Sequence, residues 1–476
     1  MSKSLLNTHR DLGASMHGSR HPRNSRFTPR TLGQLVVTVG LLAAGYRYLW
    51  RQYSHSLDRS FAYSDSDVIT NENRQEFQQY AIRNLLDTGL PFLENASPIT
   101  VQDFQERRDR LAEALVAEDT DDFVVEPGYT FKYYGNVSQP EWEAREPEER
   151  PFLMVVHPVL DRTTGMPFTE ELQIVPREEH WDPYSTHQQS DVFLGVNRVP
   201  CLMVDEEMRD FIQRGLSSAG FYVIGLRGRV GEARQIKTAR EVGILRAVNT
   251  GTMEAVRQMR KCLYPGLTEN EIATVLDNAL RAAGMEPFLD IVLFDEDASN
   301  PHGGTDGEKV LEPETFVLID VGGHLYGYSS DICRTFLPPF LEKPLKDASL
   351  SPNLEEKLKV WDIVFEAQTQ SIHRMKENLT AASVDIAARN VITEAGYGET
   401  FTHRVGHGIG IKAHESPYLS KGNTNTLLKT GMTFTSEPGI YLVNKFGVRH
   451  EDILLVQGNE EPQLLTGRRA LGPWDP

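Results

Sequence analysis

The chain has 476 residues, enough for two or three domains, and its 39% hydrophobic and 24% charged residues are typical of a soluble globular protein. Residues 1–60 carry nine Lys or Arg and two acids, whereas the rest carries 40 basic and 65 acidic residues, within a net charge of −18. An acidic body argues against nucleic acid as a partner. Three cysteines without C-x-x-C spacing exclude a disulfide framework.

Residues 1–51 are a basic leader followed by one apolar stretch, LGQLVVTVGLLAAGY, between Arg30 and Arg47. The stretch is short for a membrane span of about 20 residues, but YRYLW extends it with aromatics suited to a membrane interface. We therefore expect a single-pass N-terminal anchor in a mitochondrial or internal membrane. The alternatives are a mitochondrial presequence, or a disordered tail ahead of a buried helix in a soluble cytoplasmic protein.

Residues 52–98 are expected to form a polar linker with one helix near residues 75–86. Residues 99–230 begin with a helical segment at 101–115 and continue with apolar strands that alternate with turns. The expected strands are DDFVVEP, PFLMVVHP, ELQIVP, DVFLGV and CLMVDEE, and a helix near 206–220 precedes a last strand, FYVIGL. The pattern predicts a small α/β domain.

A second domain is expected over residues 234–470. Apolar residues at helical spacing predict a helix over 241–263, and Thr268 with Glu271 forms a capping box for the next helix. Strands follow, then helices near 354–375 and 384–395, and strands again to about 457. This order predicts two similar halves that pack sheets against helices, and an α/β (α+β) fold class for the whole chain.

Four acids and one histidine in this second domain indicate its chemistry. Each acid lies in or beside an apolar, strand-like run, and these segments hold no matching set of Lys or Arg. Buried charge is costly unless it is paired or bound to metal, so two divalent cations would balance the carboxylates and leave the histidine a neutral ligand. We therefore predict a dinuclear metal site and hydrolysis. The five residues are Asp320, Asp331, His407, Glu437 and Glu451.

The two aspartates flank a turn-rich segment, GGHLYGY. A turn centred on Leu325-Tyr326 would set Asp320 opposite Asp331 in an antiparallel pair, with their Cβ atoms about 5 Å apart. Like charges in that position are destabilising, and a cation between them would remove the penalty. The alternative, an exposed hairpin with two solvated acids, is disfavoured by the apolar neighbours.

Three histidines, His403, His407 and His414, lie in HRVGHGIGIKAHESP. In a straight strand, residues four apart lie about 13 Å apart, so His403 and His407 are not expected to ligate one ion. One is then a ligand and the other faces substrate; His414 can do the same because the glycines permit a bend. Arg449 shares a strand face with the last acid and is expected to orient a carboxylate. His302, in SNPHGG, is ambiguous from chemistry alone.

Taken in order, DVGG with D-x(10)-D, HRVGHGIG, HESP, SEPG and VRHED resemble the pita-bread metallopeptidases, in the Xaa-Pro aminopeptidase and prolidase branch. The resemblance covers about residues 234–457, and residues 99–230 resemble that branch's creatinase-like N-terminal domain more loosely. It implies a catalytic domain of two pseudo-symmetric halves, a homodimer and two divalent metals. Manganese is the metal that the family implies most often, with zinc or cobalt as alternatives, and oxygen-rich ligands agree with manganese.

Site roles follow from the same resemblance, motif by motif. Asp320 would hold one metal, His407 and Glu437 the other, and Asp331 and Glu451 would bridge both. His302 and His414 match histidines that contact substrate or stabilise the tetrahedral intermediate, and His403 matches a further substrate-side histidine, while Glu437 also matches the residue that shuttles the proton.

The activity expected from this resemblance is hydrolysis of the bond before proline, by a metal-activated hydroxide, in small peptides with proline at the second position. One alternative is a metal-dependent lyase or a non-proline C–N hydrolase on the same scaffold. Another is a catalytically inactive interaction module, in one version tethered to a membrane.

Overall fold

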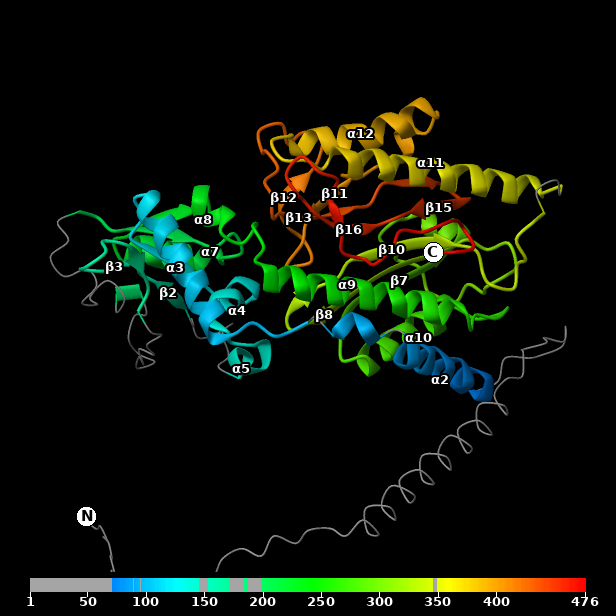
Figure 1. Cartoon of the computed structure of the whole chain (residues 1–476), viewed down its shortest axis with the longest axis horizontal. Helices are drawn as coiled ribbons and strands as arrows, with labels where there is room; N and C mark the ends of the chain where they lie inside the picture. Colours follow the sequence, from blue (N-terminus) through cyan, green and yellow to red (C-terminus); the bar gives the residue numbers. More distant parts are fainter. Residues whose placement is uncertain are drawn as a thin grey trace, which may run out of the picture. The chain divides into compact units, whose positions relative to one another are not determined.

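The computed structural model describes residues 71–88, 90–94, 96–144, 153–170, 184–185, 198–345 and 349–476. Residues Ile69–Pro476 form one compact unit. For description we divide this unit into an N-terminal lobe, residues 96–232, and a C-terminal lobe, residues 233–476, because the two parts hold separate sheets (Figure 1). The domain boundaries expected near residues 51, 98 and 230–234 stay predictions.

The N-terminal lobe is built on a four-stranded sheet of order β2-β1-β5-β6. Three strands run parallel, β1 (Asp122–Val125), β5 (Cys201–Val204) and β6 (Tyr222–Gly225), and β2 (Met154–Val156) pairs antiparallel with β1. Its other elements are α3 (Val101–Ala117), α4 (Tyr129–Gly135), α5 (Gln139–Glu143), the hairpin β3 (Val159–Leu160) with β4 (Pro167–Phe168), α7 (Asp210–Ser218) and α8 (Gly228–Glu232). The strands β1, β2, β5 and β6 fall on the predicted runs DDFVVEP, PFLMVVHP, CLMVDEE and FYVIGL, whereas the helices α4 and α5 between β1 and β2 were not predicted. The predicted strands ELQIVP and DVFLGV lie outside the described residues.

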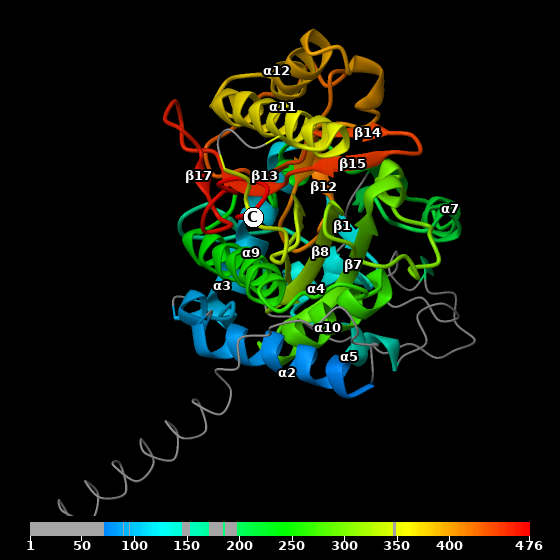
Figure 2. The ribbon, with the colours of Figure 1, turned by 90° about the vertical axis from the view of Figure 1, so that its right-hand side faces the viewer.

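The C-terminal lobe places its sheets between two layers of helices, with α9 and α10 on one side and α11 and α12 on the other (Figures 1 and 2). The first sheet has the order β10-β8-β7, with β9 paired to β8, and the second has the order β12-β11-β13-β16-β17. Each half has its own apolar core against its own helix pair. Two helices followed by strands therefore occur twice along this lobe, as the sequence predicted.

The helices and strands of the C-terminal lobe divide into two halves along the chain. The first half contains α9 (Ala239–Arg260), α10 (Glu269–Ala282), β7 (Glu286–Phe294), η3 (Asp295–Ser299), β8 (Val317–Leu325), β9 (Tyr328–Ser329) and β10 (Ile332–Phe336). The second half contains α11 (Pro352–Arg374), α12 (Ala381–Glu394), η4 (Gly398–Thr400), β11 (Gly406–Gly408), β12 (Glu415–Leu419), β13 (Thr433–Ser436), the hairpin β14 (Gly439–Leu442) with β15 (Phe446–Arg449), β16 (Asp452–Leu455) and β17 (Gln463–Leu464).

Helix ends follow local chemistry. The Thr268 side chain accepts a hydrogen bond from the backbone of Glu271, and Glu271 reciprocates, so the predicted capping box is present at α10. The same arrangement of Thr238 and Glu241 starts α9. Ser351 caps α11, where proline at the first helical position costs no hydrogen bond because that N–H has no partner inside the helix.

The hairpin β8–β9 differs from the expected one in its register. Its turn is centred on Tyr326-Gly327, whose φ angles of +51° and +85° suit a tight hairpin turn in which glycine costs least. Asp320 therefore pairs with Cys333 rather than with Asp331. The error is two residues of register, and because side chains alternate with period two, Asp320 and Asp331 keep a common face.

Residues 71–93 were expected in a linker, but they pack onto the C-terminal lobe. α2 (Asn71–Thr88) buries Phe77, Ala81 and Leu85 in the core that α9 and α10 share, and η1 (Leu90–Leu93) follows it. The spacing of these three residues, four apart, puts them on one helix face, which explains why this otherwise polar helix docks.

The membrane prediction is corrected by the structure. Among the residues that the structure describes, no helix combines the length and the hydropathy needed to cross a membrane. The apolar stretch at residues 32–46, from which the anchor was inferred, lies outside the described residues. The stretch is also shorter than the roughly 20 residues that a span needs, so the assignment to a membrane is withdrawn.

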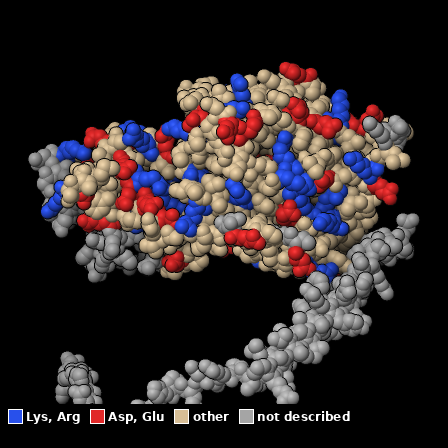
Figure 3. Space-filling view, in the orientation of Figure 1, with Lys and Arg blue, Asp and Glu red and all other residues tan. Residues whose placement is uncertain are grey.

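The face in Figure 3 carries acidic and basic side chains interspersed over both lobes. The charge imbalance seen in the sequence is therefore not gathered into one acidic surface on this face. The four acids singled out in the sequence lie inside the C-terminal lobe, buried or nearly so, at the site described below.

One pair of acids away from that site is expected to make the stability of the fold depend on pH. Asp290 in β7 and Asp277 in α10 share a hydrogen bond, and burial, followed by this neighbour, raises the pKa of Asp290 to about 8. An acid whose folded-state pKa exceeds its unfolded value destabilises the fold as pH rises between the two values. We expect Asp290→Asn to unfold at a higher temperature than wild type at pH 8, by on the order of 1 kcal/mol in stability, with the difference vanishing near pH 4.

Differential scanning calorimetry at pH 4, 6 and 8 measures this effect. Asp306→Asn, in an exposed loop, is the matched control and should not change the pH dependence. An Asp290→Asn protein that melts below wild type at pH 8 would show that the negative charge is needed in the fold.

Candidate metal centre

Both sheets of the C-terminal lobe deliver acids to one place. Asp320 lies in the middle of β8, a strand buried along almost its whole length, and Asp331 immediately precedes β10. The second sheet supplies His407 from β11, Glu437 from the residue after β13, and Glu451 from the residue before β16. All five of these side chains are buried or nearly so, which explains why their strands appear in the sequence as apolar runs interrupted by single polar residues.

Ligand atoms of these residues fall into three overlapping groups, within each of which all atoms lie within 4.8 Å of one another. The groups are Asp320 with Asp331 and Glu451; His407 with Glu437 and Glu451; and Asp331 with His407 and His414. Asp331, His407 and Glu451 each belong to two of these groups, so the three groups share ligand atoms and form one continuous cluster.

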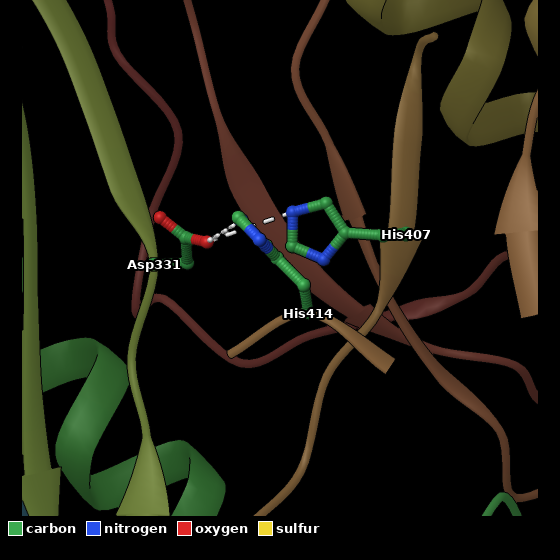
Figure 4. A group of neighbouring side chains, drawn as sticks. All are labelled: Asp331, His407 and His414. Carbon is green, nitrogen blue, oxygen red and sulfur yellow. Dashed lines mark ion pairs between the residues drawn. The ribbon is translucent and has the colours of Figure 1, made fainter. Parts of the chain in front are cut away.

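Figure 4 shows Asp331 pointing its carboxylate at two imidazole rings. The Asp331 Oδ2 atom lies 3.5 Å from Nε2 of both His407 and His414, and Nε2 of His407 lies 3.2 Å from Oε1 of Glu437. The two rings pack edge to face, 4.3 Å apart at their centroids. His414 is the outer member, with 58% of its side chain exposed, so it faces the open side of the group.

Two carboxylate oxygens of the group have no hydrogen-bond partner within the described residues, Oδ1 of Asp320 and Oε1 of Glu451. Burial, with the neighbouring acids, raises the pKa of Asp320 to about 6 and that of Glu451 well above its usual range. Burial also acts to raise the pKa of Glu437, but its contact with His407 outweighs burial and lowers it. A divalent cation would coordinate these unpaired oxygens and balance the negative charge of the neighbouring acids. The residues present therefore fit metal binding.

Asp452, the residue after Glu451, is also a buried acid, but both of its carboxylate oxygens accept hydrogen bonds. Asp452 receives Nη2 of Arg334 at 2.6 Å on Oδ1 and the Gln368 amide at 2.9 Å on Oδ2, and Thr466 donates to Oδ1 as well. Both charged side chains of this pair are 1% exposed. The chain therefore pairs a structural acid fully, whereas the acid beside it keeps a free oxygen turned to the cluster.

Arg449 contacts the first acid of the cluster and links it to a histidine. Its Nη2 donates to Oδ2 of Asp320 at 2.6 Å, and its Nη1 donates to the hydroxyl of Tyr441 at 2.9 Å. Nδ1 of His403 lies 2.7 Å from the carbonyl of Arg404 and so carries the proton, which leaves Nε2 to accept from the Tyr441 hydroxyl at 2.7 Å. Burial lowers the pKa of His403 to about 4, consistent with this neutral form.

His302 occupies the exposed loop after η3, at the same edge as His403, with 6.4 Å between their ring centroids. Nη2 of Arg449 also donates to the carbonyl of Pro301 at 3.1 Å, which ties this loop to the cluster. All nine residues singled out from the sequence thus lie at one site, but their individual roles remain predictions.

Sequence reasoning missed two groups that hold the site in shape. Tyr441, in β14, contacts Arg449 and His403 through its hydroxyl, and nothing in the sequence pattern marked it as their partner. Asn249 of α9 accepts the backbone N–H of Asp331 at 3.3 Å. No local signal marks Asn249, because its partner is 82 residues away.

Comparison with known proteins now identifies the family. A model of metallopeptidase family M24 matches residues 243–458. An uncharacterized peptidase of Schizosaccharomyces pombe is 35% identical over 440 residues, which cover 87% of this chain and 92% of that protein. The chain belongs to metallopeptidase family M24. The resemblance of the C-terminal lobe to the pita-bread metallopeptidases is confirmed, and the chain is a metallopeptidase with the mixed α/β pita-bread fold. The creatinase-like N-terminal domain stays a prediction.

Solved structures of M24 type agree with this family. A prolidase from Thermococcus sibiricus is 26% identical, with a TM-score of 0.64, over 77% of this chain and 98% of that one. An Xaa-Pro dipeptidase from Bacillus anthracis is 26% identical with a TM-score of 0.60, over 77% and 98%. A dipeptidase from Mycobacterium ulcerans is 25% identical with a TM-score of 0.65, over 78% and 98%. M24 proteins bind divalent metals, in keeping with the carboxylate and histidine groups described above.

Removing the Tyr441 hydroxyl tests the contact between Arg449 and His403. Tyr441→Phe leaves both partners buried and short of a hydrogen bond, which costs about 1–3 kcal/mol. We expect kcat for peptide hydrolysis to fall about tenfold or more, with the metal content of the protein unchanged. Tyr326→Phe, at the exposed turn of the β8–β9 hairpin, is the control. Equal kcat values for the two variants would contradict a role for Tyr441.

Proposed function

We propose that this M24 protein is a dinuclear metal-dependent peptidase that hydrolyses the bond before proline in small peptides. The observation that carries the proposal is the buried cluster of four carboxylates, two of whose oxygens have no partner within the described residues. The named activities of the structural neighbours, prolidase and Xaa-Pro dipeptidase, support the proline specificity.

Five residues of the cluster would hold the two cations. Asp320 would bind one, His407 and Glu437 the other, and Asp331 and Glu451 both. The ligand groups are compatible with this assignment, since each of the five residues belongs to at least one of them. Oxygen-rich ligands with one imidazole favour manganese, with zinc or cobalt as alternatives. When bound, the cations would neutralise the acids and activate water for attack on a peptide carbonyl.

The remaining chemistry belongs to the chain. Glu437 would take the proton from the attacking water and pass it to the leaving nitrogen, for which its contact with His407 keeps it ionised. His414 and His302, on the open side, would donate hydrogen bonds to the oxygen on which negative charge develops. Arg449 would hold Asp320 in place, and His403, fixed through Tyr441, would face the substrate.

Substrate preference rests on the chemistry of the bond. An Xaa-Pro bond has no N–H, so a site that recognises it needs no acceptor for that position and can enclose the ring in apolar surroundings. The homodimer expected from the family resemblance stays a prediction.

The decisive experiment combines metal analysis with a substrate panel on the full chain. We expect about two equivalents of metal by inductively coupled plasma mass spectrometry, and cleavage of Ala-Pro or Ala-Pro-Pro but not of Ala-Ala. Two bound metals with cleavage of Ala-Ala alone would refute the proline specificity. A metal-free protein without hydrolytic activity would refute the proposal as a whole.

Asp331→Ala removes an acid shared by both cation positions. We expect loss of at least one equivalent of metal and a fall in cleavage of Ala-Pro of at least about 10³-fold, since a metal ligand's loss removes the activation of water. Asp362→Ala, on the exposed side of α11, is the control and should retain both properties. Retained Mn-dependent cleavage by Asp331→Ala would overturn the assignment of this site.

A further inference from the structure

The segment Ile409–His414, which we call the His414 loop, joins β11 to β12 and ends on the histidine that faces the open side of the cluster. It begins two residues after His407, a candidate metal ligand, and its last residue, His414, is the histidine proposed to contact substrate. Its conformation therefore decides where the His414 imidazole stands relative to Asp331, 3.5 Å away.

The middle of the loop is buried in the other lobe. Ile411 is 4% exposed and belongs to the apolar core of the N-terminal lobe, together with residues of α3, β1, α4 and β5. The hairpin holds the loop from the opposite side, since the Ser329 N–H donates to the carbonyl of Gly410 at 2.9 Å and its hydroxyl donates to that of Ile411 at 3.2 Å. The loop thus runs between two supports.

The residue after Ile411 makes a charged contact with the N-terminal lobe. Nζ of Lys412 lies 2.9 Å from Oε1 of Glu206 and 2.7 Å from Oε1 of Glu207, both in the turn that follows β5. The Lys412 side chain is only 10% exposed. Glu206 and Glu207 are 37% and 51% exposed, so what distinguishes this contact from an ordinary surface pair is the buried stem of the lysine and the presence of two acids on one ammonium group.

The far end of the loop is fixed as well. Glu415, the residue after His414, accepts from Nζ of Lys237 at 2.6 Å, and both side chains are 3% exposed. His414 therefore lies between two ion pairs, one to the N-terminal lobe and one to the segment that enters α9. Its own side chain, more than half exposed, makes few contacts that would position it without them.

We propose that Lys412 is a positioning residue: paired with Glu206 and Glu207, it makes the N-terminal lobe the support that sets His414 at the Asp331 carboxylate. The catalytic consequence rests on the proposed function, in which His414 contacts the reacting oxygen. The structural part of the proposal, anchoring of the loop by the other lobe, stands apart from it.

Lys412→Met keeps the stem of the side chain and removes the charge. We expect kcat for Ala-Pro to fall about 10- to 100-fold with KM nearly unchanged and two equivalents of metal retained, because a displaced catalytic group weakens the reaction step rather than binding. Lys412→Arg, which keeps the charge, should restore kcat to within about threefold of wild type. Lys429→Met is the matched control, since its pair with Glu232 also links the lobes but is 45% exposed on both sides.

A double-mutant cycle separates positioning from general destabilisation. If Lys412 acts through His414, then Lys412→Met added to His414→Ala should cost no further loss of kcat, since the group being positioned is already absent. Additive losses in the double variant would overturn the positioning role.

Hydrogen–deuterium exchange followed by mass spectrometry tests the anchoring without reference to activity. Peptides covering residues 409–415 should exchange faster in Lys412→Met than in wild type or Lys429→Met, while peptides from α9 and β8 stay unchanged. Unchanged exchange of the loop would refute the proposal even if activity falls. Faster exchange in a protein that cleaves no Xaa-Pro bond would uphold the anchoring and refute only the proposed function.

Discussion

The structure depends on the burial of four carboxylates where two sheets meet. Asp320 and Asp331 come from the first half of the C-terminal lobe and Glu437 and Glu451 from the second, so the like charges face one another across the junction of the halves. Burial, together with the neighbouring acids Asp331 and Glu437, raises the pKa of Asp320 to about 6. Bound cations would reverse this repulsion and join the two halves, which couples metal binding to the cohesion of the fold.

Around this cluster the chain divides its buried polar groups into two kinds. Some are fully paired, such as Asp452 with Arg334, and need no cation to balance their charge. Others are paired on one side only: Asp320 accepts from Arg449 through one oxygen and leaves the second free. Arg449 also donates a hydrogen bond to the Tyr441 hydroxyl, which in turn contacts His403. One guanidinium therefore connects Asp320, a candidate metal ligand, with a histidine expected to face the substrate. A hydrogen-bond network of this kind holds geometry because each member is fixed by the next.

The N-terminal lobe takes part in the same arrangement. Arg107 of α3 donates to Oε1 of Glu241 at 3.3 Å and to the Tyr328 hydroxyl, and Tyr328 lies in the hairpin between the two aspartates. With Ile411 in its core, this lobe touches both segments that carry the site, the hairpin and the His414 loop. The described residues of this lobe supply none of the candidate ligands, yet they contact both segments that carry them.

Local sequence pattern was sufficient for the mixed α/β class of fold. For the site it marked the acids and the glycine-flanked histidines, whereas His302 and the role of each residue came from the family resemblance, and these roles stay predictions. Single acids inside apolar strands, glycines around His407 and a capping box at Thr268 each leave a signal within a few residues. The register of the β8–β9 hairpin was predicted two residues off, since it depends on which residues accept a left-handed backbone, yet the common face survived. The docking of α2, the partners Tyr441 and Asn249, and the contact of Lys412 with the other lobe were decided only by tertiary structure. Each of these joins residues far apart in the chain, and no local pattern records which distant surface a side chain will meet.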